Sequence, residues 1–255
     1  MARIVVFDSG FGSISIINQI QKKLKSEIIY FADQKNFPYG RKSISDLKKI
    51  IQNSILGLQK NFNPDLIVVG SNTPSLLLEN FLKTKPKIIR VLPPLNEASK
   101  LSNSTVAILS TKSLIESSQL KKYIKNHTRK KISVLPVNAS SLVDLVESGK
   151  FINNKKFCME KTNAILKTTF LQNNVDVATL SSTHLPFLLP IFSKLFPNVI
   201  FLDPASMVAE TIKHRITKNA KRNKLQIFSS GNTKTFQRNL QKIGIKNKVQ
   251  YLSLC

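Results

Sequence analysis

The sequence predicts an α/β protein made of two similar halves with mainly parallel sheets and a ligand cleft between them. Short apolar runs rich in Ile and Val recur along the 255 residues, and segments with helical periodicity separate them. One phrase is also nearly repeated: residues 67–78 read IVVGSNTPSLLL, and residues 178–189 read ATLSSTHLPFLL. Each copy places an apolar run, a serine and a polar pair before a second apolar run, as expected of two related halves.

The apolar runs are the expected strands. Continuous runs of this length are typical of parallel strands that are buried on both faces of a sheet. In chain order they are IVVF at 4–7, IIYF at 28–31, LIVVG at 66–70, IIRVL at 88–92, TVAIL at 105–109, ISVL at 132–135, VDVATL at 175–180, VIFL at 199–202 and LQIF at 225–228.

Two helices can be placed from the spacing of their apolar residues. The first follows the loop DSGFGS at 8–13, and the second covers 43–60. Ser43 with Asp46 forms the S-x-x-D pattern of a helix start. The predicted buried faces are Ile14, Ile17, Ile20 and Leu24 in the first helix, and Ile44, Leu47, Ile51, Ile55 and Leu58 in the second.

Composition indicates a folded protein of the cytoplasm. Hydrophobic residues make up 42% of the chain, and no apolar run approaches the roughly 18 residues of a membrane helix. The start, MARIVVFDSG, lacks the apolar core of a signal peptide. The two cysteines, Cys158 and Cys255, form no C-x-x-C spacing, so we expect neither a disulfide framework nor a metal site.

The charge of the chain admits two interpretations. Lys and Arg number 39 against 14 Asp and Glu, for a formal charge of +25. Such an excess favours contact with polyanions, including nucleic acid. The basic residues are spread along the chain, however, and no helix-turn-helix, zinc finger or RNA-recognition signature accompanies them. Their distribution favours lysine-coated helix surfaces.

Specific motifs then follow one another in a recognisable order. Over essentially the whole chain this order resembles glutamate racemase, of the cofactor-independent aspartate/glutamate racemase superfamily. The motifs are D-S-G-F-G at 8–12, Y-F-A-D-Q-K-N-F-P-Y-G-R-K-S at 30–43, S-N-T at 71–73, V-A-I-L-S-T-K-S at 106–113, L-V-D-L-V-E-S-G at 142–149, S-T-H at 182–184 and I-F-S-S-G-N-T-K-T-F at 227–236.

The resemblance implies two α/β domains with pseudo-twofold symmetry. The first would comprise 1–95 and 208–255, and the second, 96–207, would be inserted between these segments. A small acidic amino acid, glutamate or aspartate, would lie between them. Two cysteines would flank its α-carbon, one removing the α-proton and the other delivering a proton to the opposite face, with no cofactor and no metal. The family often forms dimers, so a homodimer is a further expectation.

Serine replaces both cysteines of the family pattern. Ser71 stands in S-N-T where the family has C-N-T, and Ser182 in S-T-H where it has C-T-H. A thiol titrates near about 8.5, whereas a serine hydroxyl is a far weaker acid. General-base catalysis favours a pKa near the working pH. Two-base racemisation by the two serines is therefore expected to be weak or altered.

The resemblance assigns further roles. Asp8 would attend the first serine and His184 the second, with Glu147 as a further acidic residue beside the site. A further hypothesis is that Asp8 and His184 activate the serines or transfer protons directly. A structural histidine and a surface glutamate are the plain alternatives. Ser13 and Ser181 stand where glycines are usual. The residues that match substrate-holding positions, and that taken singly also suit turns or N-caps, are Ser9, Pro38, Tyr39, Gly40, Asn72, Thr73 and Thr183. The glycines expected to permit tight turns beside a ligand are Gly10, Gly12 and Gly40.

Three hypotheses follow from the sequence. The first is a diverged racemase-family enzyme with weak or altered activity. The second is a non-catalytic descendant that binds an acidic amino acid as a sensor or scaffold. The third is a basic protein that contacts nucleic acid through its surface charge.

Overall fold

A computed structural model describes residues 1–129, 131–217 and 220–254, and it confirms the predicted α/β fold with two parallel sheets. Unit 1 comprises Met1–Val91 and the described residues from Ala205 onward, and unit 2 comprises Leu92–Pro204. Among the described helices, none is long and apolar enough to cross a membrane.

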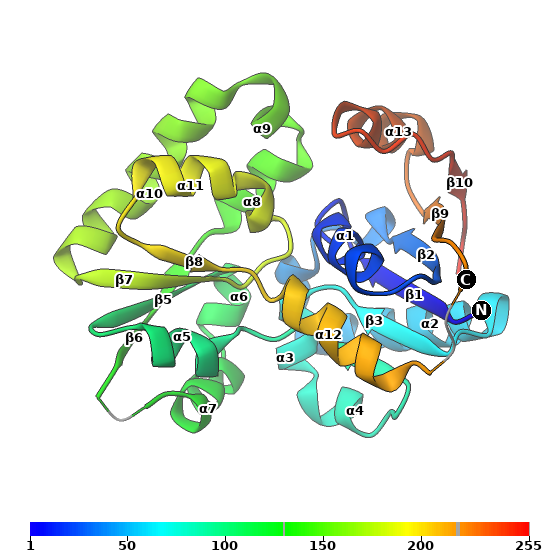
Figure 1. The fold of residues 1–255 in the computed structure, drawn as a ribbon, viewed down its shortest axis with the longest axis horizontal. Helices are drawn as coiled ribbons and strands as arrows, with labels where there is room; N and C mark the ends of the chain where they lie inside the picture. Colours follow the sequence, from blue (N-terminus) through cyan, green and yellow to red (C-terminus); the bar gives the residue numbers. More distant parts are fainter. Residues whose placement is uncertain (130, 218–219, 255) are drawn as a thin grey trace. The chain divides into compact units, whose positions relative to one another are not determined.

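Unit 1 is built on a sheet of six parallel strands in the order β10-β9-β2-β1-β3-β4 (Figure 1). The apolar run at 4–7 lies in the interior of this sheet and is fully buried, as its continuous hydrophobicity predicts. The strands are β1 (Arg3–Asp8), β2 (Glu27–Ala32), β3 (Leu66–Val69), β4 (Ile88–Arg90), β9 (Lys224–Ser229) and β10 (Val249–Tyr251).

The helices of unit 1 confirm both predicted helix positions. The hydroxyl of Ser43 accepts the N–H of Asp46 at 3.1 Å, which caps α2 where the sequence predicts its start. One predicted core residue is wrong: Ile44 is 51% exposed, because it is the first residue of α2 and lies at the end of the helix. The helices are α1 (Ile14–Lys23), η1 (Gln34–Asn36), η2 (Tyr39–Arg41), α2 (Ile44–Phe62), α3 (Asn72–Leu77), α4 (Glu79–Lys83), α12 (Ala205–Arg215) and α13 (Thr233–Lys242).

Unit 2 is built on four parallel strands in the order β6-β5-β7-β8. In Figure 1, α10 and α11 lie on one face of this sheet and α5 and α7 on the other. The strands are β5 (Thr105–Ser110), β6 (Ser133–Asn138), β7 (Val175–Leu180) and β8 (Ile200–Leu202). The helices are α5 (Leu95–Leu101), α6 (Lys112–Ile115), α7 (Ser118–His127), α8 (Ser140–Glu147), α9 (Lys150–Asn153), α10 (Lys155–Gln172), η3 (Leu185–Leu188) and α11 (Leu189–Leu195).

Backbone hydrogen bonds show how alike the two units are. The order β2-β1-β3-β4 in unit 1 matches β6-β5-β7-β8 in unit 2. Gly70 N–H donates to the Phe7 carbonyl at 2.8 Å, and Ser181 N–H donates to the Leu109 carbonyl at 2.9 Å. These bonds place Ser71 and Ser182, the residues that follow the two donors, at equivalent strand ends. The near-repeat in the sequence is therefore a repeat of structure.

The strand predictions need two corrections. All nine predicted strands are present, but β10 was not predicted because VQY is short and half polar. The edge strands of unit 2 are also not buried on both faces, and Ile200 in β8 is 47% exposed. An edge strand has a neighbour on one side only, so its side chains are less completely covered.

Candidate functional site

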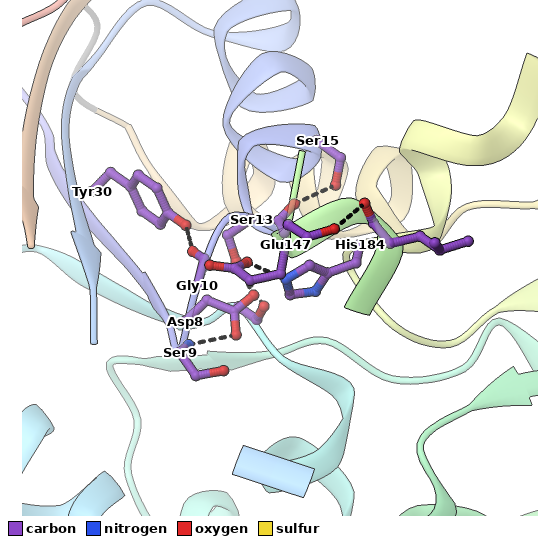
Figure 2. A network of polar contacts seen from close by, with 12 residues as sticks. Asp8, Ser9, Gly10, Ser13, Ser15, Tyr30, Glu147 and His184 are labelled. Atoms are coloured by element: carbon purple, nitrogen blue, oxygen red, sulfur yellow. Dashed lines mark hydrogen bonds and ion pairs between the residues drawn. The ribbon is translucent and has the colours of Figure 1, made fainter. Parts of the chain in front are cut away.

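The end of β1 carries a buried carboxylate. Asp8 is 1% exposed, and its Oδ1 accepts the N–H of Ser9 at 2.7 Å (Figure 2). The phenol of Tyr30 donates to the carbonyl of Gly10 in the same loop. Both contacts fix the D-S-G loop directly beyond the carboxyl end of a central strand. Ligands of open α/β sheets bind at this end.

Ser13 links this loop to the neighbouring strand end. Its hydroxyl lies 2.7 Å from the carbonyl oxygen of Gly70 and 3.2 Å from Oδ2 of Asp8. The approach is close because residue 70 is a glycine: a Cβ there would lie 2.0 Å from the Ser13 hydroxyl oxygen. The hydrogen bond from the Ser13 hydroxyl to the Gly70 carbonyl fixes the backbone immediately before Ser71.

The end of β2 holds a second buried carboxylate, which was not predicted as a site residue. Asp33 is 3% exposed, and its oxygens accept from the Tyr39 hydroxyl at 3.0 Å, the Ser230 hydroxyl at 3.1 Å and the Asn36 amide at 2.8 and 3.0 Å. Its N–H donates to the Asp8 carbonyl at 2.7 Å. The signal in the sequence was a second aspartate directly after a strand, as Asp8 ends the first.

Tyr39 is held by this carboxylate. Tyr39 is the first residue of η2 and directly follows the cis Phe37–Pro38 peptide. The short helix η2 packs beside α3. Burial raises the pKa of the Tyr39 phenol well above its ordinary value, and the nearby Asp33 and Asp8 carboxylates raise it further. The phenol is therefore a hydrogen-bond donor to Asp33 and not a proton source. The hydrogen bond from Tyr39 to Asp33 anchors the loop of Pro38, Tyr39 and Gly40, here named the 38–40 loop.

The loop after β3 presents Ser71 and its neighbours. Ser71 occupies the N-cap position of α3, but its side chain makes no capping hydrogen bond. Asn72 is 1% exposed; its Nδ2 donates to the Val91 carbonyl at 3.2 Å, while its buried Oδ1 has no partner among the described residues. Thr73 is buried in the first turn of α3. The Ser71 hydroxyl, which does not cap α3, is thus adjacent in the chain to Asn72, whose buried Oδ1 accepts no hydrogen bond from the described residues.

In unit 2, Glu147 and His184 come together. Glu147 is the last residue of α8, and His184 precedes η3, which packs against α8. Glu147 Oε2 lies 2.9 Å from His184 Nε2, and the two side chains are 16% and 5% exposed (Figure 2). Glu147 is thus not a plain surface residue. A carboxylate that holds one imidazole nitrogen fixes the orientation and tautomer of the ring.

The loop after β7 presents Ser182 and Thr183, both buried. Beneath it, the Ser181 hydroxyl lies 2.8 Å from that of Thr179, and the Ser110 hydroxyl donates to the Ser181 carbonyl at 2.8 Å. Ser110 ends β5 as Asp8 ends β1. The strand end that carries a carboxylate in unit 1 therefore carries a hydroxyl in unit 2.

The predicted site residues fall into two groups. Within unit 1 the strand ends β1, β2 and β3 are adjacent and carry Asp8, Ser9, the 38–40 loop, Ser71, Asn72 and Thr73. Within unit 2, Ser182, Thr183 and His184 follow β7, with Glu147 against the histidine. Among the described residues the glycines at positive φ are Gly149 and Gly244, so Gly10, Gly12 and Gly40 do not adopt the left-handed conformation, and their role beside a ligand stays a prediction.

A metal site is not formed by these residues. Across residues 1–129, 131–217 and 220–254, no group of three His, Cys, Asp or Glu side chains is placed to hold a metal ion. Cys158 is buried in α10, and burial raises the pKa of its thiol. Cys255 lies outside the described residues.

Solved structures define the class of this fold. RacE1, a glutamate racemase of Bacillus anthracis, superposes with a TM-score of 0.87 at 22% identity, over 99% of this chain and 98% of that one. The glutamate racemase of Escherichia coli superposes with a TM-score of 0.84 at 21% identity over the same shares. The fold is that of the glutamate racemases.

Relatives in sequence identify the family. No family model matches the chain. The glutamate racemase of Trichodesmium erythraeum is 28% identical over 263 residues, which cover 99% of this chain and 95% of that protein. The glutamate racemase of Borreliella burgdorferi is 30% identical over 182 residues, covering 71% of this chain and 67% of that protein. The chain belongs to the glutamate racemase family.

Proposed function

We propose that this protein binds a small acidic amino acid, glutamate or aspartate, through the loops that follow β1, β2, β3 and β7. The observation that carries the proposal is the buried, unpartnered Oδ1 of Asn72 beside the uncommitted hydroxyl of Ser71. A related glutamate racemase from Escherichia coli has been solved with L-glutamate, and one from Francisella tularensis with D-glutamate. Both ligands carry the ammonium group that such an acceptor requires.

The binding chemistry follows from the groups available. A buried acceptor without a donor costs about 1–3 kcal/mol, and a ligand ammonium placed on Asn72 Oδ1 removes that cost. Hydroxyls and backbone N–H groups are good hydrogen-bond donors to carboxylates. In the proposed complex, Ser9, Thr73 and Thr183 supply these donors to the carboxylates of the amino acid. The 38–40 loop contributes through its backbone, since the Tyr39 hydroxyl is already engaged with Asp33.

The chemistry of the bound amino acid is proposed to be weak or altered racemisation. Ser71 and Ser182 take the two positions where the family transfers protons, but a hydroxyl is scarcely ionised near neutral pH. The Glu147–His184 pair supplies the better base in unit 2, because an imidazole is a stronger base than a hydroxyl and the carboxylate at 2.9 Å holds the ring in place. Asp8 supplies the corresponding carboxylate in unit 1. Proton transfer would run through these groups, directly or with the serine hydroxyls as intermediaries.

Binding and chemistry are measured separately. Isothermal titration calorimetry with L- and D-glutamate and L- and D-aspartate tests binding, and NMR in heavy water follows exchange of the α-hydrogen. We expect Asn72→Ala to weaken binding about tenfold, while Asn80→Ala, an exposed asparagine in α4, serves as the matched control. If none of the four amino acids binds wild-type protein at millimolar concentration, the proposal is wrong. Binding without any exchange would instead support the non-catalytic alternative.

Two assembly predictions are measured on the same material. Sedimentation velocity tests the homodimer. A salt titration of nucleic-acid binding tests the polyanion interpretation, because contacts to phosphates produce a steep dependence on salt. Absence of binding at physiological salt would remove the nucleic-acid hypothesis.

A further inference from the structure

Unit 1 contains a hollow that no part of the proposed amino-acid site explains. Its volume is about 240 Å³, and it lies where β2, β9 and β10 end, against one face of α2. These three strands are neighbours in the sheet (Figure 1). Carboxyl ends of adjacent parallel strands are the usual place for a ligand in an α/β fold.

The charges at the hollow favour an anion. Lys35 and Lys49 line it from η1 and α2, and neither has an ion-pair partner among the described residues. The carboxylate of Asp33 also borders the hollow, but hydrogen bonds from Asn36, Tyr39 and Ser230 already occupy its oxygens. Two exposed lysines against one hydrogen-bonded carboxylate leave the lining with a net positive charge.

The rest of the wall is apolar. Phe31, Ile50 and Leu254 contribute hydrophobic surface. Leu254 can approach α2 because residue 57 is a glycine: a Cβ at Gly57 would lie 3.0 Å from the Cβ of Leu254. The segment after β10 thus closes one side of the hollow, and a small apolar group would be sheltered there from water.

We propose that this hollow binds a small organic anion. A phosphate or carboxylate lies on Lys35 and Lys49, and a compact apolar body lies against Phe31, Ile50 and Leu254. The volume of about 240 Å³ accommodates such a molecule, since a single water needs only roughly 10–15 Å³ of the same kind of volume.

The occupant acts on the 38–40 loop through Asp33, and this part of the proposal rests on the proposed function. Asp33 borders the hollow and accepts the Tyr39 hydroxyl at 3.0 Å, so one carboxylate joins the two places. Ser230 and Asn36 border the hollow and donate to the same carboxylate. A ligand that moves these donors changes the position of Asp33 and hence of the loop.

Binding at the hollow is tested without glutamate. Phenyl phosphate and benzoate are titrated into full-length ¹⁵N-labelled protein, with benzylamine as a cationic probe of similar apolar size. We expect both anions to shift the amides of Asn53, Ser54 and Ser230, and benzylamine to leave them unchanged. If only phenyl phosphate binds, the site is specific for phosphate; if only benzoate binds, for carboxylate. No shift with either anion at millimolar concentration overturns the proposal.

Variants assign the contact to the lysines. The double change Lys35→Ala with Lys49→Ala is expected to weaken anion binding at least about tenfold. Lys48→Ala removes a neighbouring α2 lysine that lies near Phe81 instead, and it should change the affinity less than about twofold. Equal losses in the double variant and in the control would contradict the assignment.

Coupling is measured by titrating L-glutamate with and without a saturating anion. We expect the two affinities to differ several-fold, and Tyr39→Phe to abolish that difference while anion binding persists. Unchanged glutamate affinity in wild-type protein overturns the coupling. If glutamate does not bind at all, the proposed function fails, and the anion site is judged on the amide shifts alone.

Discussion

Replacing Gly70 by alanine tests how the chain is packed immediately before Ser71. A Cβ at this position would lie 2.0 Å from the Ser13 hydroxyl oxygen and 3.0 Å from the Phe7 carbonyl oxygen. Ser13 would have to rotate away and give up its contacts with Gly70 and Asp8. Overpacking costs about 1–3 kcal/mol and a stranded buried polar group about 1–3 kcal/mol more. We therefore expect Gly70→Ala to lower the free energy of unfolding by about 2–6 kcal/mol.

The assay is equilibrium urea unfolding followed by circular dichroism. Ser13→Gly removes the side chain that the new methyl group meets, so the double variant Ser13→Gly with Gly70→Ala should be more stable than the sum of the single changes by at least about 1 kcal/mol. A Gly70→Ala protein within roughly 0.5 kcal/mol of wild type would refute the packing argument. Strict additivity of the two changes would refute the role of Ser13.

Three further predictions have defined outcomes. Glu147→Ala should lower the free energy of unfolding by about 1–3 kcal/mol, because it leaves buried His184 without this partner, and Glu147→Gln should cost less. Burial pushes the pKa of Glu27 upward, but Arg3 and Lys224 outweigh it, so the pKa lies below its ordinary value of 4.5. The resulting stability is complete above that value and is lost as the pH falls through the lowered pKa; Arg3→Met should reduce this loss in acid urea titrations. Because the pKa of the Tyr39 phenol is raised, absorbance at 295 nm should show this phenol still unionised above pH 10.0. The stability that the neutral phenol gives the folded protein should fade only as the pH rises past that value. If Tyr39 ionises at the same pH as the exposed tyrosine, its burial is contradicted.

Much of the fold could be predicted from the sequence because the signals are local. Apolar runs such as that at 4–7 lie in the interior of a sheet, where continuous burial and continuous hydrophobicity coincide. Ile200 lies in an edge strand, and its exposure depends on strand order, which periodicity does not contain. The predicted burial of Ile44 was wrong for a similar reason, since Ile44 is the first residue of α2 and its distance from the core depends on where that helix begins.

The candidate site divides in the same way. Strand-end residues such as Asp8 and Ser71 were predicted because a motif marks them. Asp33 was missed because its importance lies in partners up to 197 positions away, including Ser230. The contact between Glu147 and His184 joins residues 37 positions apart and could be proposed only from family resemblance.

The central claim is that two serines hold the proton-transfer positions of an acidic amino-acid site. The most direct test is α-hydrogen exchange of L-glutamate in heavy water, followed by NMR, for wild-type protein and for Ser71→Cys with Ser182→Cys. The account predicts exchange at least about 100-fold faster in the double variant, since a positioned acid–base group contributes about 10²–10⁴-fold. No gain in a double variant that keeps the wild-type circular dichroism spectrum and glutamate affinity would contradict it.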